Sequence, residues 1–222
     1  MRASFNYIGG SMARLDAGGV PVWLGVVSPY PVGGVLAPKY AVPGAFIPAG
    51  TPVNLTDKVI TPFVGWEVVS VESGSHAVTV KAGNLGFLPG ADDIIGVVGD
   101  SLSATGAAAK LVSVTAAEEP GQYVFTFADA NLDTVTAGKI LTPSAASDAG
   151  ASGNAIEAVP NAYLYNDIRI PVAEAGETFE DTAATGAAVM SHGEGILIDR
   201  TPGAGIKDML KSAIPNVIQV NG

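Results

Sequence analysis

The sequence contains no cysteine and only two histidines, His76 and His192. Disulfide bonds and thiolate metal sites are therefore excluded, and two histidines leave little for a histidine-based metal site. Charged residues are also scarce, at 14% of the 222 residues, where about a quarter is usual. So few charges are typical of a chain that covers much of its surface with other protein. We therefore predict no metal ion and no cofactor, and we expect protein partners.

Three further absences narrow the function. The net charge of −10 argues against a nucleic-acid partner, because phosphate neutralisation needs basic residues. No uncharged apolar run approaches the roughly 18 residues that a membrane span needs, so we expect no membrane partner. The first ten residues, MRASFNYIGG, lack the continuous apolar region of a secretory signal. Charge is uneven along the chain, since residues 1–56 hold three bases against one acid and the rest hold eight against twenty.

Proline and glycine punctuate residues 1–45 densely enough to break both helices and strand ladders. The same stretch is too apolar for a solvated linker. It predicts an extended N-terminal arm, which either wraps on its own domain or docks on a partner. Its candidate partner-binding residues are the apolar side chains Trp23, Leu24, Val26, Val27 and Tyr30.

From about residue 47 the pattern becomes that of β-structure. Residues 46–55 carry a turn at Ala49-Gly50 between short apolar pieces, and residues 66–72 and 76–83 read as strands. Residues 110–130 predict two strands joined by a turn at 118–121, where Pro-Gly supplies the turn chemistry. In the second of these strands, apolar alternation places one set of side chains on a shared face: Tyr123, Phe125 and Phe127.

The C-terminal third mixes short strands with one helix. Residues 144–155 hold almost only Ser, Ala, Gly, Asp and Asn and predict a linker. Residues 161–172 alternate, with Leu164, Ile168 and Ile170 on one side and Tyr163, Tyr165 and Arg169 on the other. Two short strands follow at 187–193 and 195–200, and a last one at 217–220. An amphipathic helix is predicted between the strands at 195–200 and 217–220, and it ends at Pro215 and Asn216. Its apolar stripe consists of Ile206, Met209, Leu210, Ala213 and Ile214.

The stretch Ser191-His192-Gly193-Glu194 holds the residues most suggestive of catalysis. A histidine and a carboxylate two residues apart can form an acid–base pair, but Ser191 and His192 would point to opposite faces of a strand and cannot begin a triad. We interpret His192, Gly193 and Glu194 as a structural hairpin turn, and we predict no catalytic residue and no enzyme. Asp92-Asp93 and Asp100 lack the ligand spacing of a calcium loop, and Asp92-Asp93 predicts a turn ahead of the next strand.

Three stretches in order resemble the head decoration and head fibre proteins of tailed bacteriophages. They are FIPAGTPVNLTDKVITPF at 46–63, NAYLYNDIRI at 161–170, and AAVMSHGEGILIDR at 187–200, which is followed by a short helix and a final strand. The N-terminal stretch MARLDAGGVPVWLGVVSPYPVGGVL is similar to the start of head fibre proteins from phages of gut Bacteroidales. The resemblance covers about residues 12–66 and 155–222, and the long middle departs from it.

The resemblance implies a mainly β fold with a small β-rich, decoration-protein-like body, one short C-terminal helix, an inserted β domain and an extended N-terminal arm. The expected boundaries are 1–45 for the arm, 46–66 plus 155–222 for the body, and 67–153 for the inserted domain, with its linker at 144–153. It also implies a structural virion protein on the exterior of the capsid, made in the host cytoplasm. The expected partners are the major capsid protein and the chain itself, as a homotrimer, with a fibre protein or a host surface glycan as further candidates.

Two alternatives stay open. A β-sandwich carbohydrate-binding or adhesion module of a phage fibre would need an exposed aromatic platform, for which Tyr163 and Tyr165 are the obvious pair. A hydrolase would use His192 and Glu194.

Overall fold

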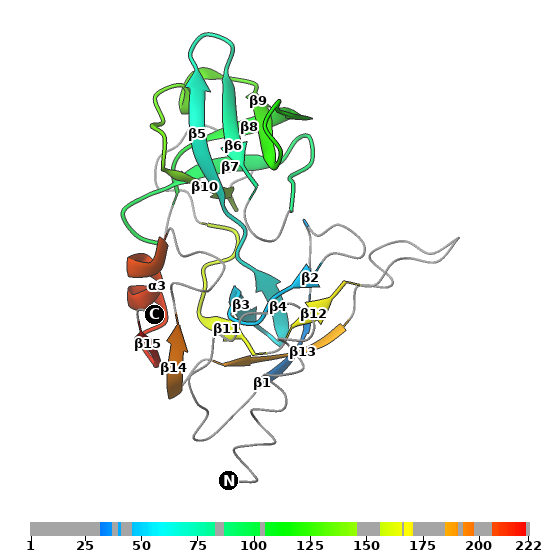
Figure 1. Cartoon of the computed structure of the whole chain (residues 1–222), viewed down its shortest axis with the longest axis vertical. Helices are drawn as coiled ribbons and strands as arrows, with labels where there is room; N and C mark the ends of the chain where they lie inside the picture. The colour runs from blue at the N-terminus through cyan, green and yellow to red at the C-terminus, as the bar shows by residue number, and fades with distance from the viewer. Residues whose placement is uncertain are drawn as a thin grey trace, which may run out of the picture.

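The computed structural model describes residues 32–36, 40, 46–82, 87–102, 105–145, 156–165, 167–170, 185–190, 193–197 and 206–220. Over these residues the fold is mainly β with one short C-terminal helix, as the sequence predicts. The described strands form two closed barrels and two small two-stranded sheets. The barrels are stacked along the long axis of the molecule, and the helix lies beside them with the last strands (Figure 1).

The lower barrel in Figure 1 has five strands in the order β1-β13-β11-β3-β4. Neighbouring strands run antiparallel except at the closing pair, where β1 and β4 are parallel. We call it the five-stranded barrel. Its strands are β1 (Val32–Leu36), β3 (Pro52–Thr56), β4 (Val59–Pro62), β11 (Ala162–Leu164) and β13 (Thr185–Met190). Beside it, β2 (Phe46–Ile47) pairs with β12 (Ile168–Arg169).

The last part of the predicted arm contains a strand of the five-stranded barrel. Residues 32–36 lie inside the predicted 1–45 arm, yet they form β1 of the five-stranded barrel. Two successive glycines, Gly33 and Gly34, indicated a break in the sequence. In the fold, β13 pairs with this stretch on one edge and β4 on the other, and those two ladders outweigh the poor strand propensity of glycine.

The upper barrel has six strands, all antiparallel, in the order β10-β5-β6-β9-β8-β7. We call it the six-stranded barrel, and every described strand between Trp66 and Pro143 belongs to it. Its elements are β5 (Trp66–Glu72), β6 (Ala77–Lys81), β7 (Ile94–Val98), β8 (Thr105–Ala116), β9 (Gln122–Phe127), the 3₁₀ turn η1 (Ala130–Leu132) and β10 (Ile140–Pro143).

Turns and bulges shape the six-stranded barrel. The predicted turn between β8 and β9 is confirmed, and Gly121 adopts the positive φ of 79° that glycine tolerates best. Register shifts occur between Val68 and Ser70 and between Leu111 and Ser113. Such β-bulges bend strands and help a sheet close on itself. The bulges also account for the exposure of the two residues they skip, Val69 and Val112.

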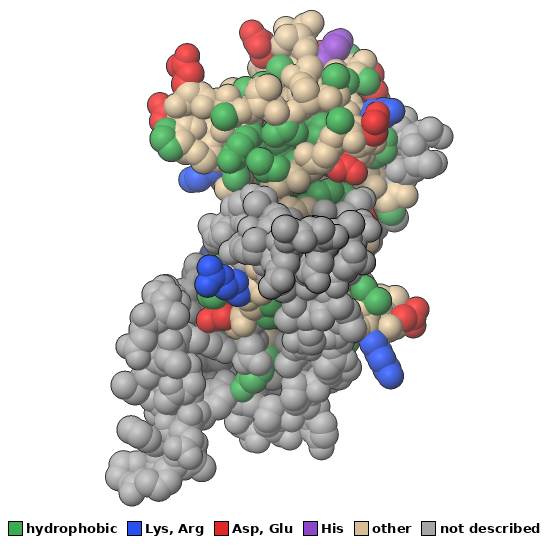
Figure 2. Space-filling model, turned by 90° about the vertical axis from the view of Figure 1, so that its right-hand side faces the viewer, with side chains coloured by type: hydrophobic (Ala, Val, Ile, Leu, Met, Phe, Trp, Pro, Cys, Tyr) green, Lys and Arg blue, Asp and Glu red, His purple; other side chains and the backbone are tan. Residues whose placement is uncertain are grey.

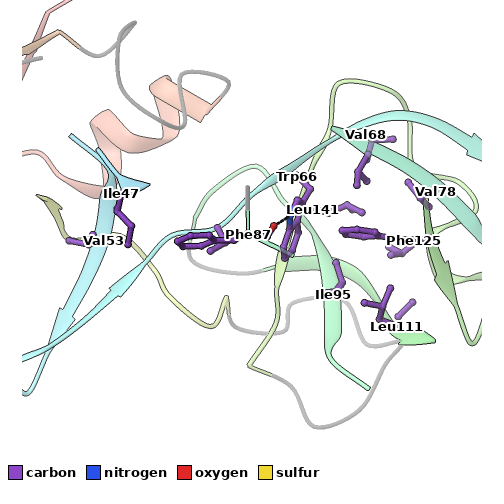
Figure 3. Packing of buried hydrophobic residues seen from close by; sticks show 14 of the residues in the cluster. Ile47, Val53, Trp66, Val68, Val78, Phe87, Ile95, Leu111, Phe125 and Leu141 are labelled. Atoms are coloured by element: carbon purple, nitrogen blue, oxygen red, sulfur yellow. Dashed lines mark hydrogen bonds between the residues drawn. The ribbon is translucent and has the colours of Figure 1, made fainter. Parts of the chain in front are cut away.

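One apolar cluster runs through both barrels. It joins Ile47 and Val53 of the lower part to Trp66, Leu141 and other residues of the six-stranded barrel. Figure 3 shows Phe87 lying between the two groups, and Phe87 is only 1% exposed. The two barrels therefore share a core, although their strand ladders are separate.

The chain passes from the five-stranded barrel to the six-stranded barrel between Pro62 and Trp66, and it packs closely there against other segments. The indole Nε1 of Trp66 donates a hydrogen bond to the carbonyl of Phe87 at 2.7 Å. At Gly65, a Cβ atom would lie 2.9 Å from Cγ2 of Ile140, so the crossing needs glycine at this position. On the return, Ser144 forms an isolated bridge with Ile156, which holds the two ends of the predicted linker together.

Candidate interaction surface

The chain ends in a small unit that packs where the two barrels meet. This C-terminal unit consists of β14 (Gly193–Leu197), α3 (Lys207–Ala213) and β15 (Val217–Val220). The predicted apolar stripe of the helix is confirmed, since Ile206, Leu210 and Ile214 are buried. They join a second apolar cluster that includes Phe63 and Tyr163 of the lower part and Val98 and Leu102 of the upper part.

Strand β15 is held firmly to the helix by its inner face. Val217 is buried in the second apolar cluster. Two residues on, the Gln219 side-chain Nε2 donates to the carbonyls of Leu210 and Ile214, both at 3.2 Å. These bonds satisfy carbonyls that the end of a helix leaves without partners. The strand therefore has a fixed inner face and a fixed position.

The outer face of β15 is apolar and exposed. Strand alternation turns Ile218 and Val220 away from the helix, and they are 65% and 36% exposed. The four residues of the strand carry no charge. This strand surface therefore brings no charge of its own to a contact, although the chain carries a net charge of −10.

Among the described residues, one edge of β15 has no partner strand. Within the described part of the chain, β15 pairs only with β14, in parallel, with Val220 beside Leu197. Parallel sheets are normally covered on both faces, and an open apolar edge is a template for another strand. The open edge and outer face of β15 together form the candidate interaction surface, which we call the β15 surface.

Among the described residues, Tyr40 packs at the junction between the barrels. The Tyr40 hydroxyl donates to Glu157 Oε2 at 2.7 Å, and its ring meets Trp66 edge-on at 6.3 Å. Burial, and then the hydrogen bond to Glu157, raises the pKa of Tyr40 well above its ordinary value. The cavity beside Tyr40 and Val64 measures about 10 Å³, roughly the room of one water molecule. This cavity is too small for a sugar or a cofactor.

The predicted partner-binding residues of the arm, Trp23, Leu24, Val26, Val27 and Tyr30, lie outside the described residues. Sequence analysis identified residues 217–220 as a strand but missed their exposure. The alternation of Val-Ile-Gln-Val was the available signal, since it places one apolar pair opposite the glutamine.

The predicted hairpin at His192-Gly193-Glu194 does not have the predicted pairing. The strands on either side belong to different sheets: β13 pairs with β1 and β11, whereas β14 pairs with β15. Both edges of β13 are already occupied, so β14 cannot pair with it. Gly193 and Glu194 begin β14, and His192 lies outside the described residues.

Tyr163 and Tyr165 do not form the exposed aromatic platform that the alternative adhesion module would need. Tyr163 is 0% exposed, and Tyr165 is half-buried. Both faces of β11 are covered, because Ala162 and Leu164 belong to the barrel core while Tyr163 joins the cluster around the helix. Burial raises the pKa of the Tyr163 hydroxyl. These two tyrosines therefore present no stacking surface to a sugar.

The aspartates that could suggest a calcium site serve a turn. Asp93 Oδ2 accepts a hydrogen bond from the backbone N–H of Gly90 at 2.8 Å, and Asp92 pairs with Lys110 at 2.7 Å. Among the described residues, no group of three or more acidic, histidine or cysteine side chains is placed to hold a metal ion. In the same part of the chain, no helix is long and apolar enough to cross a membrane.

Comparison with known proteins gives no relative. No protein-family model, no curated protein and no solved structure matches this chain. Function is therefore inferred from the surface itself. In Figure 2, apolar side chains gather across the middle of one face of the six-stranded barrel, and charged side chains lie around its margin. That distribution agrees with the low charge of the sequence.

Proposed function

We propose that this chain is a structural virion protein that binds the outside of a tailed-phage capsid as a decoration or head-fibre base protein. In this function it stabilises the head or presents a fibre. Its partners are the major capsid protein and further copies of itself, as a homotrimer. The order of the three resembling stretches along the sequence motivates the proposal.

The observation that carries the proposal is the β15 surface on a rigid support. Ile218 and Val220 are exposed on a strand that the Gln219 side chain and the buried Val217 hold in place. A fixed apolar strand binds a partner with little loss of conformational entropy, which favours permanent assembly over transient contact. Each contact is small, and many equivalent sites on a capsid would add avidity.

The shared core of the two barrels supports the same function. Phe87 and Trp66 lie at the junction, and neither barrel can turn freely without disturbing them. A body mounted on a shell would then hold the six-stranded barrel at a fixed angle. The burial of Tyr163 removes the aromatic pair on which the alternative adhesion module depended.

The test uses heads of a tailed phage that carries this gene, purified from a strain in which the gene is deleted. Purified protein added back should co-sediment with these heads and saturate at a fixed number of copies per head. Because apolar burial drives the contact, binding should persist in high salt. Heads from the deletion strain that bind no added protein at any salt concentration would refute the proposal.

A further inference from the structure

The β15 surface lacks one component, an extended apolar strand. Its outer face presents Ile218 and Val220, and its free edge presents main-chain groups that a neighbouring strand can pair with. A strand added there would lie against apolar side chains and would carry no charge of its own. The occupant is therefore predicted to be uncharged, apolar and free of proline over four to six residues.

One stretch of this chain has those properties. Val22–Val27 reads VWLGVV and holds no charge and no proline, so each residue has an N–H for a ladder. Even and odd positions are both apolar or glycine, which suits a strand buried on both faces. Charge agrees too: residues 1–31 hold Arg2 and Arg14 against Asp16, a net +1, whereas the remaining chain carries −11.

The N-terminal segment enters the described structure on the side of the molecule where β15 begins. Val32, the first residue of β1, pairs with Val189. Gly193 follows Val189 by four residues, at most about 14 Å of extended chain, and Gly193 is the partner of Val217. The exit point of the segment and the start of β15 therefore lie within a few strand widths of one another.

We propose that the free edge of β15 accepts residues Val22–Val27 from a second copy of this chain as an added strand. The proposal rests on the proposed function in one respect, that copies of the chain assemble with one another. Pro29 and Pro31 lie between this segment and β1, and proline favours the extended backbone that an added strand needs. With exit and acceptor on the same side, each copy can supply a strand to the next around a closed ring.

Engineered cysteines test the proposal directly, because the chain has none of its own. Cysteine replaces Val22, Leu24 or Val26 in one preparation and Ile218 in another. The two preparations are mixed, allowed to exchange subunits and oxidised gently. Since a disulfide needs Cα atoms within about 7 Å, a cross-linked pair of chains forms only where the strand lies beside β15. The matched control is Val112→Cys, which is 53% exposed on the six-stranded barrel.

We expect at least one of the three arm positions to cross-link with Ile218→Cys at least about ten times more than with Val112→Cys. Ile218→Asp should weaken assembly of the chain about ten-fold or more, because it places a charge in an apolar contact, and Val112→Asp should leave it unchanged. Double variants carrying both cysteines in one chain should also link between copies.

Three results would overturn the proposal: cross-links only within one chain, disulfides only between two Ile218→Cys chains, or equal linkage to Val112→Cys. Binding to heads is measured separately with the same proteins. Cross-linking without head binding would leave the strand exchange standing and remove the capsid function. Head binding without cross-linking would leave the capsid function standing and refute the strand exchange.

Discussion

Replacement of Phe87 by alanine tests whether the two barrels form one cooperative unit. Phe87 is 1% exposed and lies between the residues of the two barrels (Figure 3). Removing a fully buried phenylalanine ring typically costs about 3–5 kcal/mol, from lost transfer free energy and the cavity left behind. The Phe87 carbonyl keeps its hydrogen bond from Trp66, since the substitution spares the backbone. The loss therefore reports the ring and its packing.

Phe46→Ala is the matched control, because Phe46 is 45% exposed and loses the same atoms. Its expected cost is at most about 1 kcal/mol. Unfolding in urea is followed by far-UV circular dichroism, which reports both barrels, and by tryptophan fluorescence, for which Trp66 is a buried reporter at the junction. We expect coincident transitions in the parent protein and a shift of both signals together in Phe87→Ala.

Two outcomes would refute the shared core. One is a parent protein whose two signals unfold in well-separated steps, which would make the barrels independent. The other is a Phe87→Ala variant no less stable than Phe46→Ala, which would mean that the ring contributes nothing at the junction.

Two further predictions concern single residues. Asp57 and Lys58 form the two-residue turn between β3 and β4, with positive φ angles of 51° and 66°. Because glycine adopts positive φ without strain, Lys58→Gly should raise the free energy of unfolding by about 1 kcal/mol, whereas Lys58→Ala should leave it unchanged. Equal urea midpoints for the two variants would contradict this prediction. Burial raises the pKa of Tyr40 and Tyr163, so the stability they contribute is complete below about pH 10, where unfolded tyrosine titrates, and declines above it. Stability should therefore fall less steeply from about pH 9 to 11 in Tyr40→Phe than in the parent, and equal slopes would argue against a protonated, buried Tyr40.

The sequence was sufficient for the local elements. The strands at 66–72 and 122–127, the turn at Pro120-Gly121 and the helix over Lys207–Ala213 all follow from residue alternation or from a helical stripe. These features depend on contacts between residues close in the chain, or on which face of an element is apolar. Both are legible in the order of side chains.

The sequence alone did not predict which distant segments pair as neighbouring strands. Val32–Leu36 was assigned to the arm because Gly33 and Gly34 break a strand pattern, and only the ladders with β13 and β4 make it a barrel strand. The predicted hairpin at Gly193 failed for the related reason that β1 and β11 already hold both edges of β13. Hydrogen bonds of a ladder are the same for any sequence, so residue type says little about which edge a strand finds.

Exposure was likewise settled only by the tertiary structure. Tyr163 and Ile218 both stand in short alternating strands, and their sequences alone suggest that either could face solvent. The C-terminal unit packs over Tyr163 and buries it, whereas it leaves Ile218 on the outer face of β15. Alternation determines which residues share a face, but the element that covers that face comes from elsewhere in the chain. The composition thus determined a low surface charge and the residue alternation a β-protein, whereas the packing of α3 against both barrels decided which apolar side chains remain available to a partner.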